Sequence, residues 1–335
     1  MLTAILFIVM ILILVIPHEL GHLIVAKLCD VQVNEFSVGM GPLLFQKQKG
    51  DTLYSFRLFP IGGYCAMEGE DEEKTDNPRS FNNKKPLQKI AILVAGVVMN
   101  VLIAILIFTI CMMIRTVPTN EIASITPNSP AETAGITSGQ RLIQVDNVKS
   151  SDWSVLSQAI SEYEAGDILE LTVSKDGVEH TYFITPEYSE ENQRYLIGIT
   201  MKSTRNPIDC TRYGIRTAWA MNTALLQSFK MLFQGQVSTD DMAGPVGIVK
   251  LVDDAKDVGF MNYMLLLGLM SLNLAIINIL PFPALDGGRI LFVIIRRFTG
   301  NAISDNAEAI IHFIGMMALF ALIIYLTFND IMKLF

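Results

Sequence analysis

The chain has 335 residues, of which 51% are hydrophobic and only 17% are charged. A soluble globular protein usually carries more charge, so this composition favours several membrane spans joined to a soluble module. The formal net charge of −8 argues against a nucleic-acid partner, which would require a basic face.

The first predicted element is an apolar segment, about residues 2–26, which has no charge from residue 2 to 17 and is long enough to cross a bilayer. It lacks the basic start and the cleavage site of a signal peptide, so we expect a retained helix. The motif HELGH occupies residues 18–22, and a helix places His18 and His22 on one face, where both can bind one ion. Zinc suits these ligands best, and Glu19 reaches the attacking water as a general base. Such groups are costly inside a membrane, which favours a functional site over two histidines satisfied by neighbouring groups.

A strand-forming segment follows between residues 35 and 67. Its alternating apolar residues are interrupted by glycine-rich turns, with the motif GMGP at residues 39–42 and PIGGY at residues 60–64. We expect a two-hairpin sheet that dips into the membrane, which is allowed only where protein buries it or a cavity hydrates it. An ordinary cytosolic hairpin is the alternative. A second apolar span covers about residues 90–114.

Residues 115–203 are predicted to form a small soluble α/β domain. The series SPAETAGITSGQRLIQVDNVKS resembles a PDZ domain of the bacterial protease-associated type, and no second copy occurs. PDZ domains generally bind a peptide, often its C-terminus, as an extra strand at a sheet edge. The expected helices are 129–136 and 153–163, and the expected strands are 122–125, 139–146, 168–174, 179–185 and 196–200.

Residues 204–261 form a connector with a predicted helix at 211–234, whose aromatic and basic side chains suit a membrane interface or packing against the PDZ-like domain. The motif GPVG at 244–247 is expected to end this helix before the third span. The third apolar span is predicted at 262–281 and the fourth at 309–327. Basic residues concentrate between the first and second spans and between the third and fourth spans. These two loops are therefore expected in the cytoplasm, and the PDZ-like domain outside.

Asp286 is the best candidate for the third metal ligand that a catalytic zinc requires. It follows the third span, where Pro281 and Pro283 cannot continue a helix and the backbone opens. Two glycines after Asp286 allow a sharp turn. The alternative role of Asp286 is to cap the helix that follows. The remaining histidines are less suitable, because His180 lies in the PDZ-like domain and His312 is expected as a helix-end or interfacial residue.

These motifs together resemble the site-2 protease family of intramembrane zinc metalloproteases, and most closely its RseP type (regulator of sigma-E protease). HExxH, GxGP, PxGGY, one PDZ domain and NxLPxPxLDGG occur in the family's order over nearly the whole chain. The resemblance implies an α-helical polytopic membrane protein with four transmembrane helices, a membrane re-entrant β-sheet and one inserted α/β PDZ domain. The implied parts are residues 1–114 (protease core), 115–203 (PDZ domain), 204–261 (interfacial connector) and 262–335 (remainder of the core).

The resemblance also implies the roles of individual residues. His18, His22 and Asp286 correspond to the Zn²⁺ ligands, and Glu19 to the catalytic base. The implied substrate-binding residues are Asn273, Asn278, Pro281, Pro283, Gly39, Gly41, Gly62 and Gly63, although helix–helix packing is an equal alternative for Asn278.

The implied activity is cleavage of single-pass proteins in the bacterial cytoplasmic membrane, usually after a first cut, with anti-sigma-factor-like proteins and remnant signal peptides as substrates. The lipid bilayer and a peptide C-terminus at the PDZ domain are the other expected partners, and no nucleic acid is expected. A non-catalytic membrane scaffold that binds through its PDZ-like domain is one rival interpretation. A metal transporter is another, although its spans should carry polar residues along a path rather than at one site.

Overall fold

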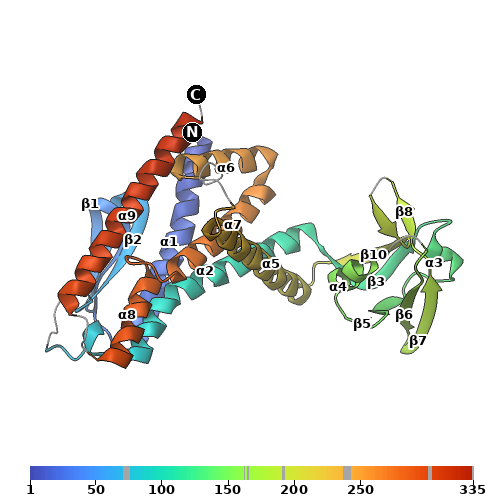
Figure 1. Cartoon of the computed structure of the whole chain (residues 1–335), viewed down its shortest axis with the longest axis horizontal. Coiled ribbons are helices and arrows are strands. Elements are labelled where there is room, and N and C mark those ends of the chain that lie inside the picture. Colours follow the sequence, from blue (N-terminus) through green and yellow to red (C-terminus); the bar gives the residue numbers. More distant parts are fainter. Residues whose placement is uncertain are drawn as a thin grey trace. The chain divides into compact units, whose positions relative to one another are not determined.

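The computed structural model describes residues 1–70, 76–161, 163, 166–190, 193–236, 243–300 and 304–333. The chain divides into two compact units, one formed by Met1–Cys111 with Gly214–Phe335 and the other by Met112–Tyr213 (Figure 1). The first unit holds long helices and a two-stranded sheet, and the second is rich in short strands. Residues 237–242 of the predicted connector lie outside the described residues.

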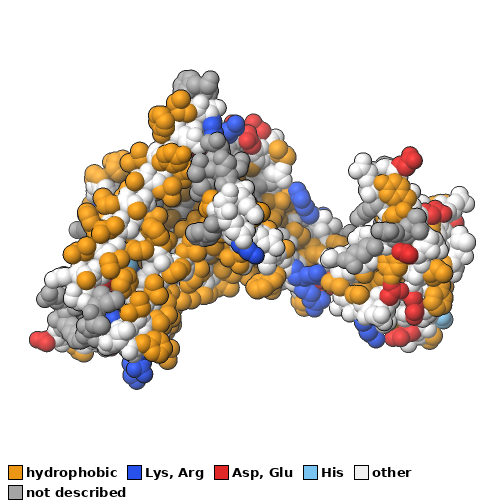
Figure 2. Space-filling view, in the orientation of Figure 1, with side chains coloured by type: hydrophobic (Ala, Val, Ile, Leu, Met, Phe, Trp, Pro, Cys, Tyr) orange, Lys and Arg blue, Asp and Glu red, His pale blue; other side chains and the backbone are white. Residues whose placement is uncertain are grey.

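Four helices in the described part of the chain are long and apolar enough to cross a membrane. They are α1 (Leu2–Leu28), α2 (Pro86–Arg115), α7 (Phe260–Ile279) and α9 (Asp305–Met332). Hydrophobic side chains cover the surface along α9 in Figure 2, and many of them are exposed, among them Phe313, Phe320 and Ile324. A helix that is apolar even on its exposed side is typical of a membrane span. The expected set of four membrane-spanning candidates is therefore confirmed.

Three further helices belong wholly or partly to the first unit: α5 (Pro207–Phe233), α6 (Pro245–Val258) and α8 (Asp286–Thr299). Helix α5 corresponds to the predicted helix 211–234. The interpretation of residues 244–247 as a break missed α6, because Pro245 opens that helix with Gly244 as its N-cap. Proline fits the first helical position, where its fixed φ suits a helix and its missing N–H costs nothing.

The sheet of the first unit consists of β1 (Val33–Lys49) and β2 (Thr52–Met67), which pair antiparallel. Residues 35–38 have partners on two sides, 63–66 and 53–56, while residues 43–49 pair with 52–57. Two long, bent strands therefore bring four segments side by side in one sheet, which is built from one long hairpin instead of the expected two. The bends need unusual backbone conformations, since Gly39, Gly41 and Gly62 have φ of 85°, 86° and 87°. A 3-10 turn, Phe81–Asn83, precedes α2.

The second unit has a main sheet in the order β10-β3-β4-β6-β7, with β5 beside β4. Its strands are β3 (Val117–Ile125), β4 (Arg141–Val145), β5 (Val148–Lys149), β6 (Leu169–Lys175), β7 (Val178–Ile184) and β10 (Ile199–Thr204). A small hairpin consists of β8 (Glu187–Ser189) and β9 (Arg194–Leu196), and the helices are α3 (Pro130–Thr133) and α4 (Trp153–Ser161). Alternate residues of β6, namely Leu169, Leu171 and Val173, are fully buried beneath α4, where they pack with Leu156. Each helix and strand predicted for this region has a counterpart, but β3 begins at Val117 instead of residue 122, and β5, β8 and β9 were not predicted.

Candidate metal centre

Two histidines of α1 and the first residue of α8 bring three donor atoms together. The Nε2 atoms of His18 and His22 are 3.2 Å apart. Oδ2 of Asp286 lies 3.2 Å from Nε2 of His18 and 3.5 Å from Nε2 of His22. Both histidines are buried. Within the described residues this is the one group of three or more His, Cys, Asp or Glu side chains whose donor atoms converge to within 4.8 Å.

Close packing of α1 against α2 places the two histidines. A Cβ atom on Gly21 of α1 would lie 2.5 Å from the carbonyl oxygen of Ala95. A Cβ atom on Gly96 of α2 would lie 2.5 Å from Nε2 of His22 and 2.6 Å from Cε1 of His18. Small residues let helix backbones approach closely inside a membrane. Gly21 therefore lets the backbones of α1 and α2 approach each other, and Gly96 leaves the space that the imidazole rings fill.

Helix α2 also orients the imidazole rings. Nδ1 of His22 donates to the carbonyl oxygen of Ile92 at 2.8 Å. This bond places the ring proton on Nδ1 and leaves the Nε2 lone pair directed at Asp286. Nδ1 of His18 lies 3.3 Å from the amide Nδ2 of Asn100, a fully buried residue whose Oδ1 has no hydrogen-bond partner. A half-turn of the Asn100 amide would let Oδ1 accept the His18 Nδ1 proton, giving His18 the same tautomer.

Asp286 reaches the histidines because the chain folds back sharply after α7. Helix α7 ends at Ile279. A Cβ atom on Gly287 would lie 2.2 Å from the carbonyl oxygen of Ile279, and one on Gly288 would lie 2.2 Å from that of Phe282. Only glycine permits this approach of α8 to the end of α7. Leu285 is the N-cap of α8, without a side-chain capping bond, so the carboxylate of Asp286 does not serve as the cap.

Glu19 lies beside this donor group and next to the sheet. A Cβ atom on Gly63 of β2 would lie 3.6 Å from Cγ of Glu19 and 2.7 Å from the carbonyl oxygen of Ser37. The sheet therefore runs directly past the glutamate. Arg289, in the first turn of α8, forms an ion pair with Glu70. Burial lowers the pKa of the Arg289 guanidinium, while the carboxylates of Glu308 and Glu19 act in the opposite direction.

The donor set fits a zinc ion. Two imidazole nitrogens with lone pairs and a carboxylate oxygen repel one another at 3.2–3.5 Å unless a cation or a shared proton lies between them. Oδ2 of Asp286 is buried and has no hydrogen-bond partner apart from this approach to the imidazoles. Three nitrogen and oxygen ligands with a fourth position open are the arrangement of catalytic zinc sites.

The other predicted site residues fall in different places. Asn278 on α7 directs Nδ2 to 3.3 Å from Nε2 of His18, so the structure brings it to the donors. Asn273 is half-buried more than one turn earlier on α7, and Pro281 and Pro283 lie in the loop before Asp286. His180 lies on β7 of the second unit.

Sequence reasoning missed Gly96 and Asn100. A usable signal was present, since a glycine and an asparagine one helical turn apart interrupt an otherwise apolar span. It also missed the contact of His312, whose Nδ1 accepts a hydrogen bond from the backbone N–H of Ala284 at 2.8 Å.

The fold and these donors define the class of protein, a zinc metalloprotease with apolar helices around its site. The chain belongs to peptidase family M50, whose family model matches residues 6–322, and the predicted membership of the site-2 protease family is thereby confirmed.

Curated relatives agree with this assignment. A Clostridium acetobutylicum protein, provisionally named a zinc metalloprotease, is 35% identical over 95% of this chain and 94% of its own. The zinc metalloprotease RasP of Oceanobacillus iheyensis is 30% identical over the full length of both chains. The regulator of sigma-W protease RasP of Bacillus subtilis is 28% identical over 99% of both chains. Among solved structures, the PDZ domain of an SdrC-like protein of Listeria monocytogenes aligns with 25% of this chain and 86% of its own, at 15% identity and a TM-score of 0.23.

Proposed function

We propose that this zinc metalloprotease cleaves single-pass membrane proteins within the lipid bilayer. The observation that carries the proposal is the position of the donor group. His18 and His22 lie inside α1, a helix long and apolar enough to span a membrane. Asp286 reaches them from the start of α8, just after the membrane-spanning candidate α7 ends. In this proposal the three side chains hold zinc, and Glu19 is the catalytic base.

In the proposed peptide-bond hydrolysis, each of these residues has a separate role. A zinc ion held by these donors supplies Lewis-acid activation of the peptide carbonyl and of water. Glu19 accepts a proton from the attacking water and then donates it to the nitrogen of the leaving amine. The ring proton of His22 stays on Nδ1, which donates to the Ile92 carbonyl oxygen throughout, and this preserves the ligating tautomer. In this proposal the amide of Asn278, which lies 3.3 Å from Nε2 of His18, hydrogen-bonds the substrate backbone.

A membrane-spanning substrate must unwind before it can be cut, because a helix uses its amide groups internally. The sheet offers a replacement for these hydrogen bonds, since β2 passes Glu19 at Gly63 and an extended substrate can add to a strand edge. We place the unwound substrate between this sheet and the loop after α7. The residues proposed to contact it are Gly39, Gly41, Gly62, Gly63, Asn273, Asn278, Pro281 and Pro283.

The proposed location is the bacterial cytoplasmic membrane, with the re-entrant sheet at the cytoplasmic side and the PDZ-like domain outside. Basic residues near the sheet favour the cytoplasmic side. They are Lys27 in the last turn of α1, Lys84 just before α2 and Arg289 in the first turn of α8. The proposed organisation keeps the parts 1–114, 115–203, 204–261 and 262–335. Anti-sigma-factor-like proteins and remnant signal peptides, already shortened by a first cut, are the proposed substrates, and a peptide end is the proposed ligand of the PDZ-like domain.

The test compares a Glu19→Gln variant with the unmodified protein on a tagged single-pass membrane substrate. Glutamine keeps the shape of the side chain but cannot take the proton, so cleavage should fall by at least about a hundredfold. Glu179→Gln is the matched control, because Glu179 is exposed on β7 in the second unit. Cleavage by the Glu19→Gln variant at the rate of this control would overturn the assignment.

The same experiment separates the protease from a non-catalytic scaffold. A scaffold would bind the substrate through its PDZ-like domain and would be insensitive to the charge of Glu19. The convergence of His18, His22 and Asp286 beside Glu19 favours the enzyme, because a scaffold gains nothing from such a group buried among apolar helices.

A further inference from the structure

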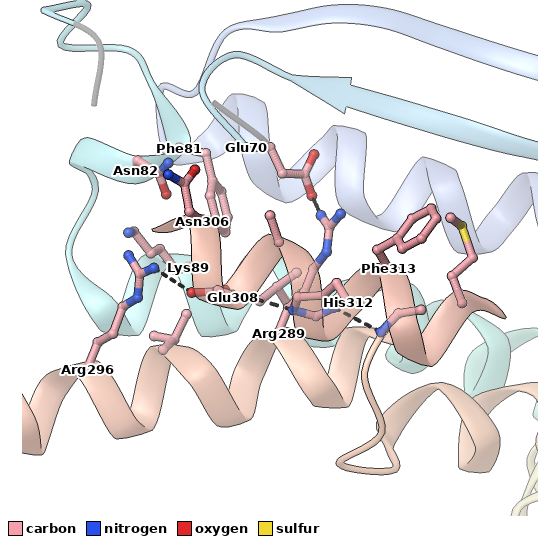
Figure 3. A pocket seen from close by; sticks show the side chains of 15 residues that line it. Glu70, Phe81, Asn82, Lys89, Arg289, Arg296, Asn306, Glu308, His312 and Phe313 are labelled. Carbon is pink, nitrogen blue, oxygen red and sulfur yellow. Dashed lines mark hydrogen bonds and ion pairs between the residues drawn. The ribbon is translucent and has the colours of Figure 1, made fainter. Parts of the chain in front are cut away.

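Helix α9 contacts the loop that precedes Asp286. Residues 280–285 connect α7 to α8, and the backbone N–H of Ala284 in this loop donates to Nδ1 of His312 at 2.8 Å (Figure 3). The helix comes close to the loop at a second point, Gly315. A Cβ atom there would lie 2.6 Å from the carbonyl oxygen of Pro283. The fourth membrane-spanning candidate therefore packs directly on the loop that leads into the proposed third ligand.

The backbone of this loop is strained two residues before Asp286. Ala284 has a φ of 79°, in the left-handed region that side chains other than glycine rarely adopt. Such a conformation persists only where the surroundings hold it, and strained residues of this kind concentrate at functional sites. Nδ1 of His312 accepts the hydrogen bond that the backbone N–H of this strained residue donates. It is therefore placed to hold the loop in the conformation that directs Asp286 at the histidines.

The neighbours of His312 fix its ring. Because Nδ1 accepts a hydrogen bond, the ring proton lies on Nε2, which faces Oε1 of Glu308 at 3.9 Å. Glu308 forms an ion pair with Arg296 of α8 at 2.6 Å, and the imidazole packs on the ring of Phe292 at a centroid distance of 5.3 Å. Three of these side chains, those of Arg296, Glu308 and His312, line a cavity of about 440 Å³ (Figure 3). Arg296, Glu308 and His312 thus link α8 and α9 to the loop.

We infer that His312 is a positioning residue for the metal site, which holds the strained loop at Ala284 so that Asp286 keeps its ligating position. The inference rests on the proposed ligand set. It gives α9 a role in the zinc site although the donor side chains themselves come from α1 and α8. Residues that orient metal ligands indirectly typically change metal affinity by about 10-fold to 100-fold when they are replaced.

The test measures zinc affinity of the full-length protein by competition with a chelator, together with the visible absorption of the cobalt-loaded protein. His312→Leu removes the acceptor and should weaken zinc binding about tenfold or more and shift the cobalt spectrum. His312→Asn is the conservative variant, because its Oδ1 can accept the same hydrogen bond, and it should bind zinc within about threefold of the unmodified protein. Adding Ala284→Gly to His312→Leu should recover part of the loss, since glycine adopts the positive φ without strain.

Two further variants separate the possible outcomes. Phe320→Leu, an exposed position of the same helix, is the control for a change that only alters α9. Asp286→Ala tests the ligand set itself, because undiminished zinc affinity there would overturn the ligand assignment rather than the role of His312. If Asp286→Ala weakens zinc binding while His312→Leu does not, or if His312→Asn loses as much affinity as His312→Leu, the inference about His312 is overturned.

Discussion

Gly96 offers the sharpest test of how the site is built, because the change is a single methyl group. The Cβ atom of a Gly96→Ala variant would lie 2.5 Å from Nε2 of His22, whereas ordinary contact begins at 3.4 Å. The ring and the new methyl group must therefore separate by about 0.9 Å. A catalytic constellation tolerates about 0.5 Å, and a misplacement of about 1 Å can cost roughly a hundredfold in rate.

The fold should survive this change better than the site. Overpacking costs about 1–3 kcal/mol, and replacing glycine by alanine in a helix returns about 1 kcal/mol. We therefore expect Gly96→Ala to remain folded and to lose about tenfold to a hundredfold in zinc affinity and in cleavage of a membrane substrate. Gly268→Ala is the matched control, because its Cβ atom would meet the ring of Phe108 instead of the donors. Zinc affinity equal to that of the control would refute the packing argument.

Two further predictions concern the turn and the sheet. Gly287→Ala places a methyl group 2.2 Å from the backbone oxygen of Ile279, which cannot yield as a side chain does. We expect a loss of about 3 kcal/mol or more in the free energy of unfolding, together with weaker zinc binding, and a wild-type thermal midpoint would contradict this. Burial raises the pKa of Glu35, but hydrogen bonds from Ser55 and Arg57 outweigh it and hold the pKa below its usual range. Glu35→Gln should therefore destabilise the protein above about pH 5, with a difference that shrinks as the pH falls through the folded-state pKa; a pH-independent difference in thermal midpoint would argue against this.

The sequence predicted the features of the site that depend on local geometry. Helical spacing alone brings His18 and His22 to one face of α1, and the apolar runs identify the four spans. The short helices were harder, because Pro245 and Gly287 are typical of breaks and turns yet stand at the beginnings of α6 and α8. The contact of Asn100 with His18 depends on which helices pack together and on how far they are shifted along their axes. A single sequence does not show either of these.

The three donor side chains share one structural feature, which explains why α1 alone is not enough to form the site. Each donor is held by a different packed neighbour. His22 is oriented by the Ile92 carbonyl of α2, and His18 lies against Asn100 of the same helix. Asp286 depends on the fold-back of α8 against the end of α7. Since every one of these contacts requires close approach of backbones, a change that separates the helices by less than 1 Å should release the metal before it unfolds the protein.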